Sequence, residues 1–177
     1  MKKNYVKNLC LCAVLSALCF ALDYCTTVLN SATGFLKLPL SAFPIIIAAV
    51  MCGPFMGAAV GLVGTFLTQL ITYGIAPTTV LWILPAGIRG LCVGLLFTAF
   101  GKSLKRTALT AEIIISSVIV TALNTLVIYL DSVFYGYYTP AVVWGGFIAR
   151  TVTGIAASAV FAMLVPSVIK ILRQHMK

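Results

Sequence analysis

The sequence has few acidic residues and a single histidine. Its 177 residues include only three Asp and Glu side chains, and His175 lies in a basic tail. Enzymes that work by acid–base chemistry need clustered carboxylates or histidines, and this chain has too few of either. The Walker A, His-Glu-x-x-His and Gly-x-Ser-x-Gly motifs are also missing. We therefore expect neither an ATPase nor another enzyme.

The cysteines do not form a metal-binding pattern. No pair of Cys-x-x-Cys motifs occurs, and most of the cysteines fall inside apolar segments. We interpret them as small buried side chains and expect no metal and no cofactor. They are Cys10, Cys12, Cys19, Cys25, Cys52 and Cys92.

Charge is absent from a long central run. No charged residue occurs between Leu38 and Ile88. As one helix this run would be about 75 Å long, far more than the ~30 Å hydrocarbon core of a bilayer, so it must fold back. With 62% hydrophobic and 8% charged residues, the whole chain has the composition of a membrane protein.

Turn signals divide the chain into apolar segments. Cys52-Gly53-Pro54 is one such signal, and a polar stretch at 73–79 is another. We predict an all-α membrane protein, with residues 1–177 forming a single integral membrane domain. Its architecture is expected to be a compact bundle of six transmembrane helices, the second of them short. The predicted spans are 8–29, 39–52, 55–73, 79–100, 108–130 and 140–169.

The cationic residues predict the orientation. They form three clusters, which six crossings place on one side of the membrane, and the positive-inside rule makes that side cytoplasmic. Both termini are then cytoplasmic in a multi-pass protein of the cell membrane. The net charge of +9 is explained by topology, so we expect no nucleic-acid partner. The clusters are Lys2, Lys3 and Lys7; Lys102, Lys105 and Arg106; and Lys170, Arg173 and Lys177.

Two arginines lie within predicted spans. Arg89 and Arg150 are each about 10 residues from the outer end of a span, or roughly 15 Å deep. A guanidinium at that depth costs at least a few kcal/mol unless it meets a cavity, a partner or a ligand. Two interpretations stay open. The arginines bind an anionic substrate, or they lock the bundle, with Arg89 paired to Asp23 or to helix carbonyls and Arg150 paired to Asp131.

Other polar and aromatic residues point to the outer half of the bundle. Asn124 lies seven residues before Asp131 and therefore on the same helix face, which makes both candidates for substrate binding. Trp82, Tyr129 and Trp144 fall near the predicted outer surface. They can form an interfacial belt or stack on a ligand. The sequence thus predicts an outward-facing pocket.

Small residues recur at helical spacing on three spans. Such stripes let helices approach closely, either inside the bundle or at a partner-binding surface. They are Ala13, Ala17 and Ala21 on the first span; Gly57 and Gly61 on the third; and Gly146, Gly154, Ser158 and Ala162 on the sixth.

Several segments together resemble a known family. The stretches "LPLSAFPIIIAAVMCGPFMGAAVGLVG", "LWILPAGIRGLCVGLL" and "LNTLVIYLDSVFYG", with the alanine stripe of the first span, resemble the substrate-binding S component of energy-coupling factor (ECF) transporters. The similarity covers nearly the whole chain. It implies capture of a vitamin from outside, followed by association with a transmembrane coupling protein and two cytoplasmic ATPases. It also implies that Ala13, Ala17 and Ala21 form the docking surface.

Within the family, the chain is most similar to the folate-type branch. That resemblance implies a substrate with an aromatic pterin and carboxylates, so Arg89 and Arg150 would bind the carboxylates and the three aromatic candidates would stack on the ring. Thr65 stands where that branch leads us to expect an acidic residue, and pantothenate remains an alternative. A structural assembly subunit and a membrane-embedded enzyme are the alternatives from other classes.

Overall fold

The computed structural model describes residues 2–33 and 38–175, which form helices and short connections without a strand. The prediction of an all-α membrane bundle is confirmed. The helices in these ranges are α1 (Lys2–Thr33), α2 (Ala42–Cys52), α3 (Pro54–Tyr73), α4 (Thr79–Ala99), α5 (Arg106–Phe134), α6 (Pro140–Trp144) and α7 (Phe147–His175).

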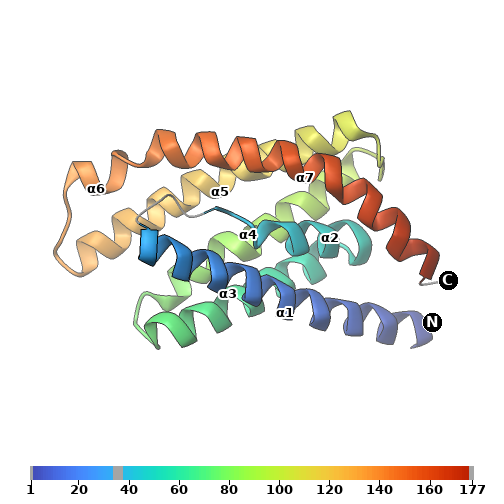
Figure 1. Ribbon diagram of the computed structural model, residues 1–177, viewed down its shortest axis with the longest axis horizontal. Helices are drawn as coiled ribbons and strands as arrows, with labels where there is room; N and C mark the ends of the chain where they lie inside the picture. The colour runs from blue at the N-terminus through green and yellow to red at the C-terminus, as the bar shows by residue number, and fades with distance from the viewer. Residues whose placement is uncertain (1, 34–37, 176–177) are drawn as a thin grey trace.

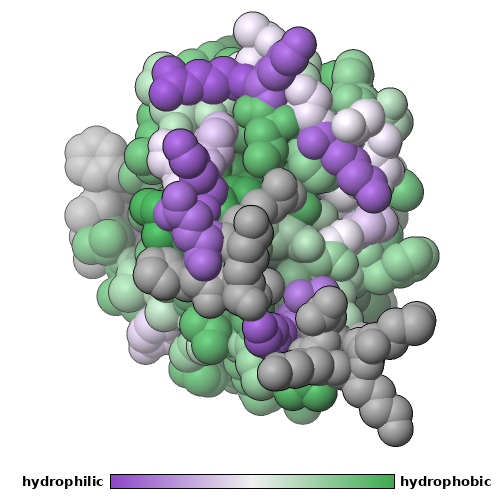
Figure 2. Space-filling model, turned by 90° about the vertical axis from the view of Figure 1, so that its right-hand side faces the viewer, coloured by the Kyte–Doolittle hydropathy of each residue, from purple (hydrophilic) through white to green (hydrophobic). Residues whose placement is uncertain are grey.

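The long helices run roughly along the length of the molecule (Figure 1). The beginning of α1 and the end of α7 lie at one end, and α6 lies at the other (Figure 1). Hydrophilic side chains stand among apolar ones at the end that holds the termini (Figure 2). The exposed cations Lys102, Lys105 and Arg106 occur where α4 connects to α5. The charge distribution therefore distinguishes the two ends of the bundle.

Five segments are long and apolar enough to cross a membrane, and α2 is the short helix of the bundle. The five lie within α1, α3, α4, α5 and the stretch from α6 through α7. Helix α2 has 11 residues and is about 16 Å long at 1.5 Å per residue, roughly half the hydrocarbon thickness. Most of its residues are buried and the rest are half-buried, so α2 is an internal helix that occupies part of the depth of the bundle.

The last apolar segment is divided, where the sequence predicted one helix over 140–169. Thr139 caps α6 by accepting a hydrogen bond from the Val142 N–H at 3.4 Å, and a turn at Gly145 and Gly146 separates α6 from α7. A Cβ on Gly145 would lie 2.4 Å from the Ala141 carbonyl oxygen, so glycine permits this turn. The apolar pattern continues across the break and therefore did not reveal it.

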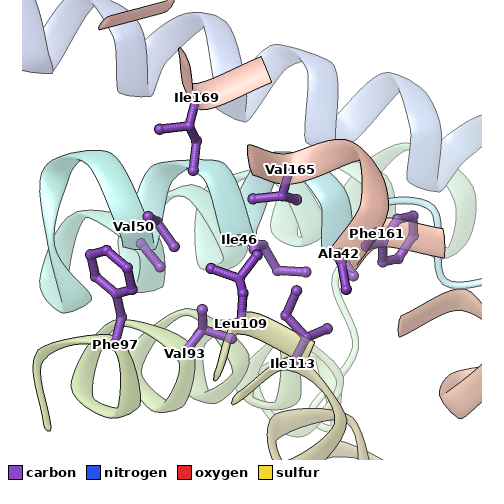
Figure 3. Close-up of a cluster of buried hydrophobic side chains, with 12 residues drawn as sticks. Ala42, Ile46, Val50, Val93, Phe97, Leu109, Ile113, Phe161, Val165 and Ile169 are labelled. Atoms are coloured by element: carbon purple, nitrogen blue, oxygen red, sulfur yellow. The ribbon is translucent and has the colours of Figure 1, made fainter. Parts of the chain in front are cut away.

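Two apolar clusters cover α2 on its different faces. One joins α2 to α4, α5 and α7, with Ile46, Val93 and Val165 at its centre (Figure 3). The other joins α2 to α1 and α3 and contains Leu15 and Val60. These side chains fill the half of the bundle nearer the termini. Among residues 2–33 and 38–175, the other half has no short internal helix like α2.

Two of the three small-residue stripes lie inside the bundle. A Cβ on Gly57 would meet Ala49 of α2 at 2.6 Å, and one on Gly61 would meet the Ala86 carbonyl of α4 at 2.4 Å. On α7, Gly154 faces Ser117 of α5 in the same way. The stripe of α1 is different, because Ala13, Ala17 and Ala21 are all exposed.

Candidate functional site

A cavity of about 540 Å³ occupies the half of the bundle that α2 does not fill. Its wall is formed by α1, the beginning of α2, α3, α4, α5 and α7. This volume lies within the usual range of small-molecule sites. Its polar lining residues are Asp23, Asn30, Ser41, Thr65, Gln69, Arg89, Ser117, Thr121, Asn124, Arg150 and Thr153.

Arg89 lines the cavity from the middle of α4 and is 8% exposed. Gly90, the next residue, packs directly on the backbone of α3: a Cβ there would lie 2.2 Å from the Gly57 carbonyl carbon. This close contact fixes the part of α4 that carries the arginine. Within residues 2–33 and 38–175, the guanidinium donates no hydrogen bond. Its donors are thus available to a molecule in the cavity.

Arg150 lines the cavity from the first turn of α7. One terminal nitrogen, Nη2, donates to the Val143 carbonyl at 2.9 Å. The Nε atom is buried and has no hydrogen-bond partner among the described residues. A buried donor without an acceptor costs about 1–3 kcal/mol, and an acceptor group on a ligand would remove that cost. The positive end of the α7 dipole also favours an anion here.

The carboxylates proposed as partners of these arginines make other contacts. Asp23 accepts a hydrogen bond from the Ser41 hydroxyl at 3.2 Å. Asp131 accepts one from the Trp82 indole N–H at 3.2 Å and another from the Tyr137 hydroxyl. In the described part of the chain, neither Arg89 nor Arg150 forms an ion pair with a carboxylate. The arrangement favours the interpretation in which the arginines face a ligand.

Four of the residues that the sequence analysis selected for substrate binding line the same cavity. Arg89 and Trp82 come from α4, Asn124 from α5 and Arg150 from α7. Trp82 lies in the first turn of α4 and lines the cavity while its indole N–H bonds Asp131 of α5. These elements are separated in sequence, so the bundle brings the four side chains together.

The other three selected residues do not line the cavity. Tyr129 is 41% exposed and packs edge-on against Tyr138, with ring centroids 5.6 Å apart. Trp144 is 60% exposed and contacts the ring of Phe147. Asp131 is buried beside Trp82, outside the wall of the cavity. The sequence predicted how far along the helix each of these residues lies. It did not predict toward which side of the helix each side chain points.

Several lining residues were not selected from the sequence. Ser117 and Thr121 precede Asn124 on α5 at helical spacing, and Gln69 is the one amide side chain within α3. A search for polar side chains sharing one face of an apolar helix would have found the α5 set. The contribution of Thr153 depended on how α7 is rotated, which the sequence pattern does not define.

These features define a multi-pass, all-α membrane protein with a polar cavity between its helices. Residues 7–168 match the family model described as "ECF transporter, substrate-specific component". The chain belongs to this family, and it is therefore a substrate-specific subunit of a membrane transporter. No curated protein and no solved structure matches the chain.

Proposed function

We propose that this subunit captures a small anionic vitamin in the cavity at the α6 end, with a folate-like substrate favoured. The observation that carries the proposal is the presence of Arg89 and Arg150 in one cavity without a carboxylate partner among the described residues. Buried guanidinium groups are costly in a membrane, and an anionic substrate would offset that cost. Arginine also binds carboxylates through two parallel hydrogen bonds, which gives directional selectivity.

Trp82 supports a substrate with an aromatic ring. It is the aromatic candidate that lines the cavity, and an indole offers a flat surface for stacking. A folate supplies both a pterin for this surface and carboxylates for the arginines. Pantothenate supplies one carboxylate and no ring, so it uses the arginines alone and remains the alternative within the family.

The exposed stripe of α1 supports a docking surface. Ala13, Ala17 and Ala21 lie on the outside of the bundle, whereas the stripes of α3 and α7 are used for internal packing. Small side chains allow another helix to approach closely. We propose that the transmembrane coupling protein docks here and links the subunit to two cytoplasmic ATPases, with the termini on the cytoplasmic side.

The test begins with native mass spectrometry of the protein purified in mild detergent, with identification of any released small molecule. Titrations with folic acid and with pantothenate then follow. We expect folic acid to bind and to quench tryptophan fluorescence through Trp82. Binding of pantothenate in its place would select the alternative substrate.

Arginine variants test the role of the charges. Arg89→Ala and Arg150→Ala should each weaken folic acid binding about 10- to 100-fold, since each removes charge-assisted hydrogen bonds. Lys105→Ala is the matched control, because it removes an exposed cation far from the cavity and should leave affinity unchanged. Unaltered binding together with lower thermal stability in both arginine variants would favour a structural assembly subunit.

A further inference from the structure

Asp131 connects the wall of the cavity to the outer connection between α5 and α6. Its side chain is 7% exposed. Oδ1 accepts the indole N–H of Trp82 at 3.2 Å, and Oδ2 accepts the hydroxyl of Tyr137. Trp82 belongs to α4 and Tyr137 to the connection formed by residues 135–139. One carboxylate thus joins three parts of the chain at the α6 end.

We propose that Asp131 is a positioning residue, which holds the indole of Trp82 in the cavity wall and ties it to the outer connection. This extends the proposed function, because it assumes that Trp82 contacts the substrate. It assigns Asp131 a task different from the direct substrate binding that the sequence suggested. Asp131 acts on the substrate through the orientation of Trp82.

The geometry of the two hydrogen bonds supports this role. An indole has a single donor, so one acceptor limits the rotation of the whole ring. A carboxylate acceptor makes that bond stronger than a neutral acceptor would. Because the second oxygen is occupied by Tyr137, the carboxylate itself is held at both ends. The ring of Trp82 is therefore oriented before a ligand arrives, which lowers the cost of binding.

The outer connection is held in place by further contacts. The Tyr137 backbone N–H donates to the Ser132 carbonyl at 3.0 Å, and the adjacent Tyr138 packs against Tyr129 of α5. The hydrogen bond to Asp131 raises the pKa of Tyr137 to about 12. The phenol is protonated at neutral pH with or without this shift, so it remains a donor. Asp131 thus links Trp82 to residues 135–139 through two hydrogen bonds.

Tryptophan fluorescence tests the proposal without any ligand. The chain has two tryptophans, so a Trp144→Phe background leaves Trp82 as the single reporter. In that background, Asp131→Leu should increase acrylamide quenching of Trp82 about twofold or more, because the ring loses its anchor and moves more freely. Asp131→Asn keeps an oxygen acceptor and should restore most of the protection. Unchanged quenching and emission in Asp131→Leu would overturn the proposal.

Two tyrosine variants refine the test. Tyr137→Phe removes one hydrogen bond from Asp131 and should give intermediate quenching. Tyr135→Phe is the matched control in the same connection and should behave as the parent protein. If Asp131→Leu fails to fold, as judged by size-exclusion chromatography, Tyr137→Phe decides the question. Parent-like quenching in Tyr137→Phe would then overturn the proposal.

Folic acid affinity provides the second readout. We expect Asp131→Leu to bind about tenfold more weakly than the parent protein, and Asp131→Asn to recover part of the loss. Affinity that is equal in all the variants would contradict a positioning role. Failure of the parent protein to bind either folic acid or pantothenate would instead contradict the proposed function, and the quenching data would still decide whether Asp131 positions Trp82.

Discussion

Glu112 is a buried acidic residue that does not line the cavity. It lies on α5 with 0% exposure, and neither carboxyl oxygen has a hydrogen-bond partner among the described residues. Its neighbours in sequence, Leu109 and Ile113, belong to the apolar cluster around α2. A buried polar group without partners lowers stability by about 1–3 kcal/mol. Glu112 therefore lowers the stability of the bundle.

We predict that Glu112→Leu keeps or raises the melting temperature. Removing both unpartnered oxygens while filling a similar volume should raise Tm by about 2–4 °C for each kcal/mol recovered. Thermal unfolding in mild detergent measures this shift. Glu112→Gln is the control, since it retains two polar atoms and should give no gain. A clear fall in Tm for Glu112→Leu would mean that the carboxyl contributes to the fold.

At the scale of single residues, the sequence indicated part of the site. Arg89, Arg150 and Asn124 are polar residues in apolar spans, and their cost in a bilayer makes such residues candidates for function. Tyr129 shows the limit of this reasoning. It follows the lining residue Ile128, and a step of one residue turns a side chain by about 100° around the helix. The position of a residue along a helix can be predicted from the sequence. The direction in which its side chain points depends on how the helices pack.

At the scale of helices, α3 and α4 are joined by unusually close contacts. A Cβ on Gly90 would lie 2.2 Å from the backbone of Gly57, and one on Gly94 would lie 2.4 Å from the Pro54 Cα. Real side chains do not approach backbone atoms so closely, so the helices would have to separate. The glycines thus fix both the contact between α3 and α4 and the position of Arg89, which directly precedes Gly90.

Gly90→Ala should therefore destabilise the bundle by about 1–3 kcal/mol, a typical cost of overpacking. We expect a lower Tm and weaker substrate binding, because α4 shifts as a unit with Arg89. Gly146→Ala is the matched control for Tm alone, since its Cβ would make only ordinary contact, at 3.6 Å, with the guanidinium of Arg150. Equal melting temperatures for Gly90→Ala and the parent protein would show that α3 and α4 are less tightly packed than described.

The sequence predicted the helices better than their interruptions. The Gly53-Pro54 and 73–79 signals separate α2, α3 and α4 where turns were expected, because glycine and proline punctuate otherwise apolar runs. The turn at Gly145 and Gly146 was not anticipated, since apolar residues flank it on both sides. It places Arg150 in the first turn of α7, closer to a helix end than the uninterrupted span implied.

At the scale of the whole molecule, the cavity and the alanine stripe are separate surfaces. The cavity lies inside the bundle at the α6 end, and the stripe lies on the outside of α1. A change on one surface should therefore leave the other intact. This separation allows substrate capture and partner docking to be measured independently.

We predict that Ala17→Phe blocks docking without altering substrate binding. A large ring in the middle of the stripe prevents close helix approach, so copurification with the coupling protein and uptake in cells should be lost. Folic acid affinity should stay within about twofold of the parent value, since no cavity residue changes. Val152→Phe is the control, because it adds a ring to an exposed site on α7. Retained copurification in Ala17→Phe would place the docking surface elsewhere.

The short length of α2 has a consequence for how substrate choice can change. Ala42 and Ile45, at the beginning of α2, form the floor of the cavity. The length of α2 therefore sets the depth of the cavity. One added turn would advance that floor by about 5.4 Å, and one turn fewer would deepen the chamber by the same amount. The five long segments need not move in either case. On this plan, a change in the length of one internal helix alters the depth of the cavity and leaves the exposed alanine stripe of α1 unchanged.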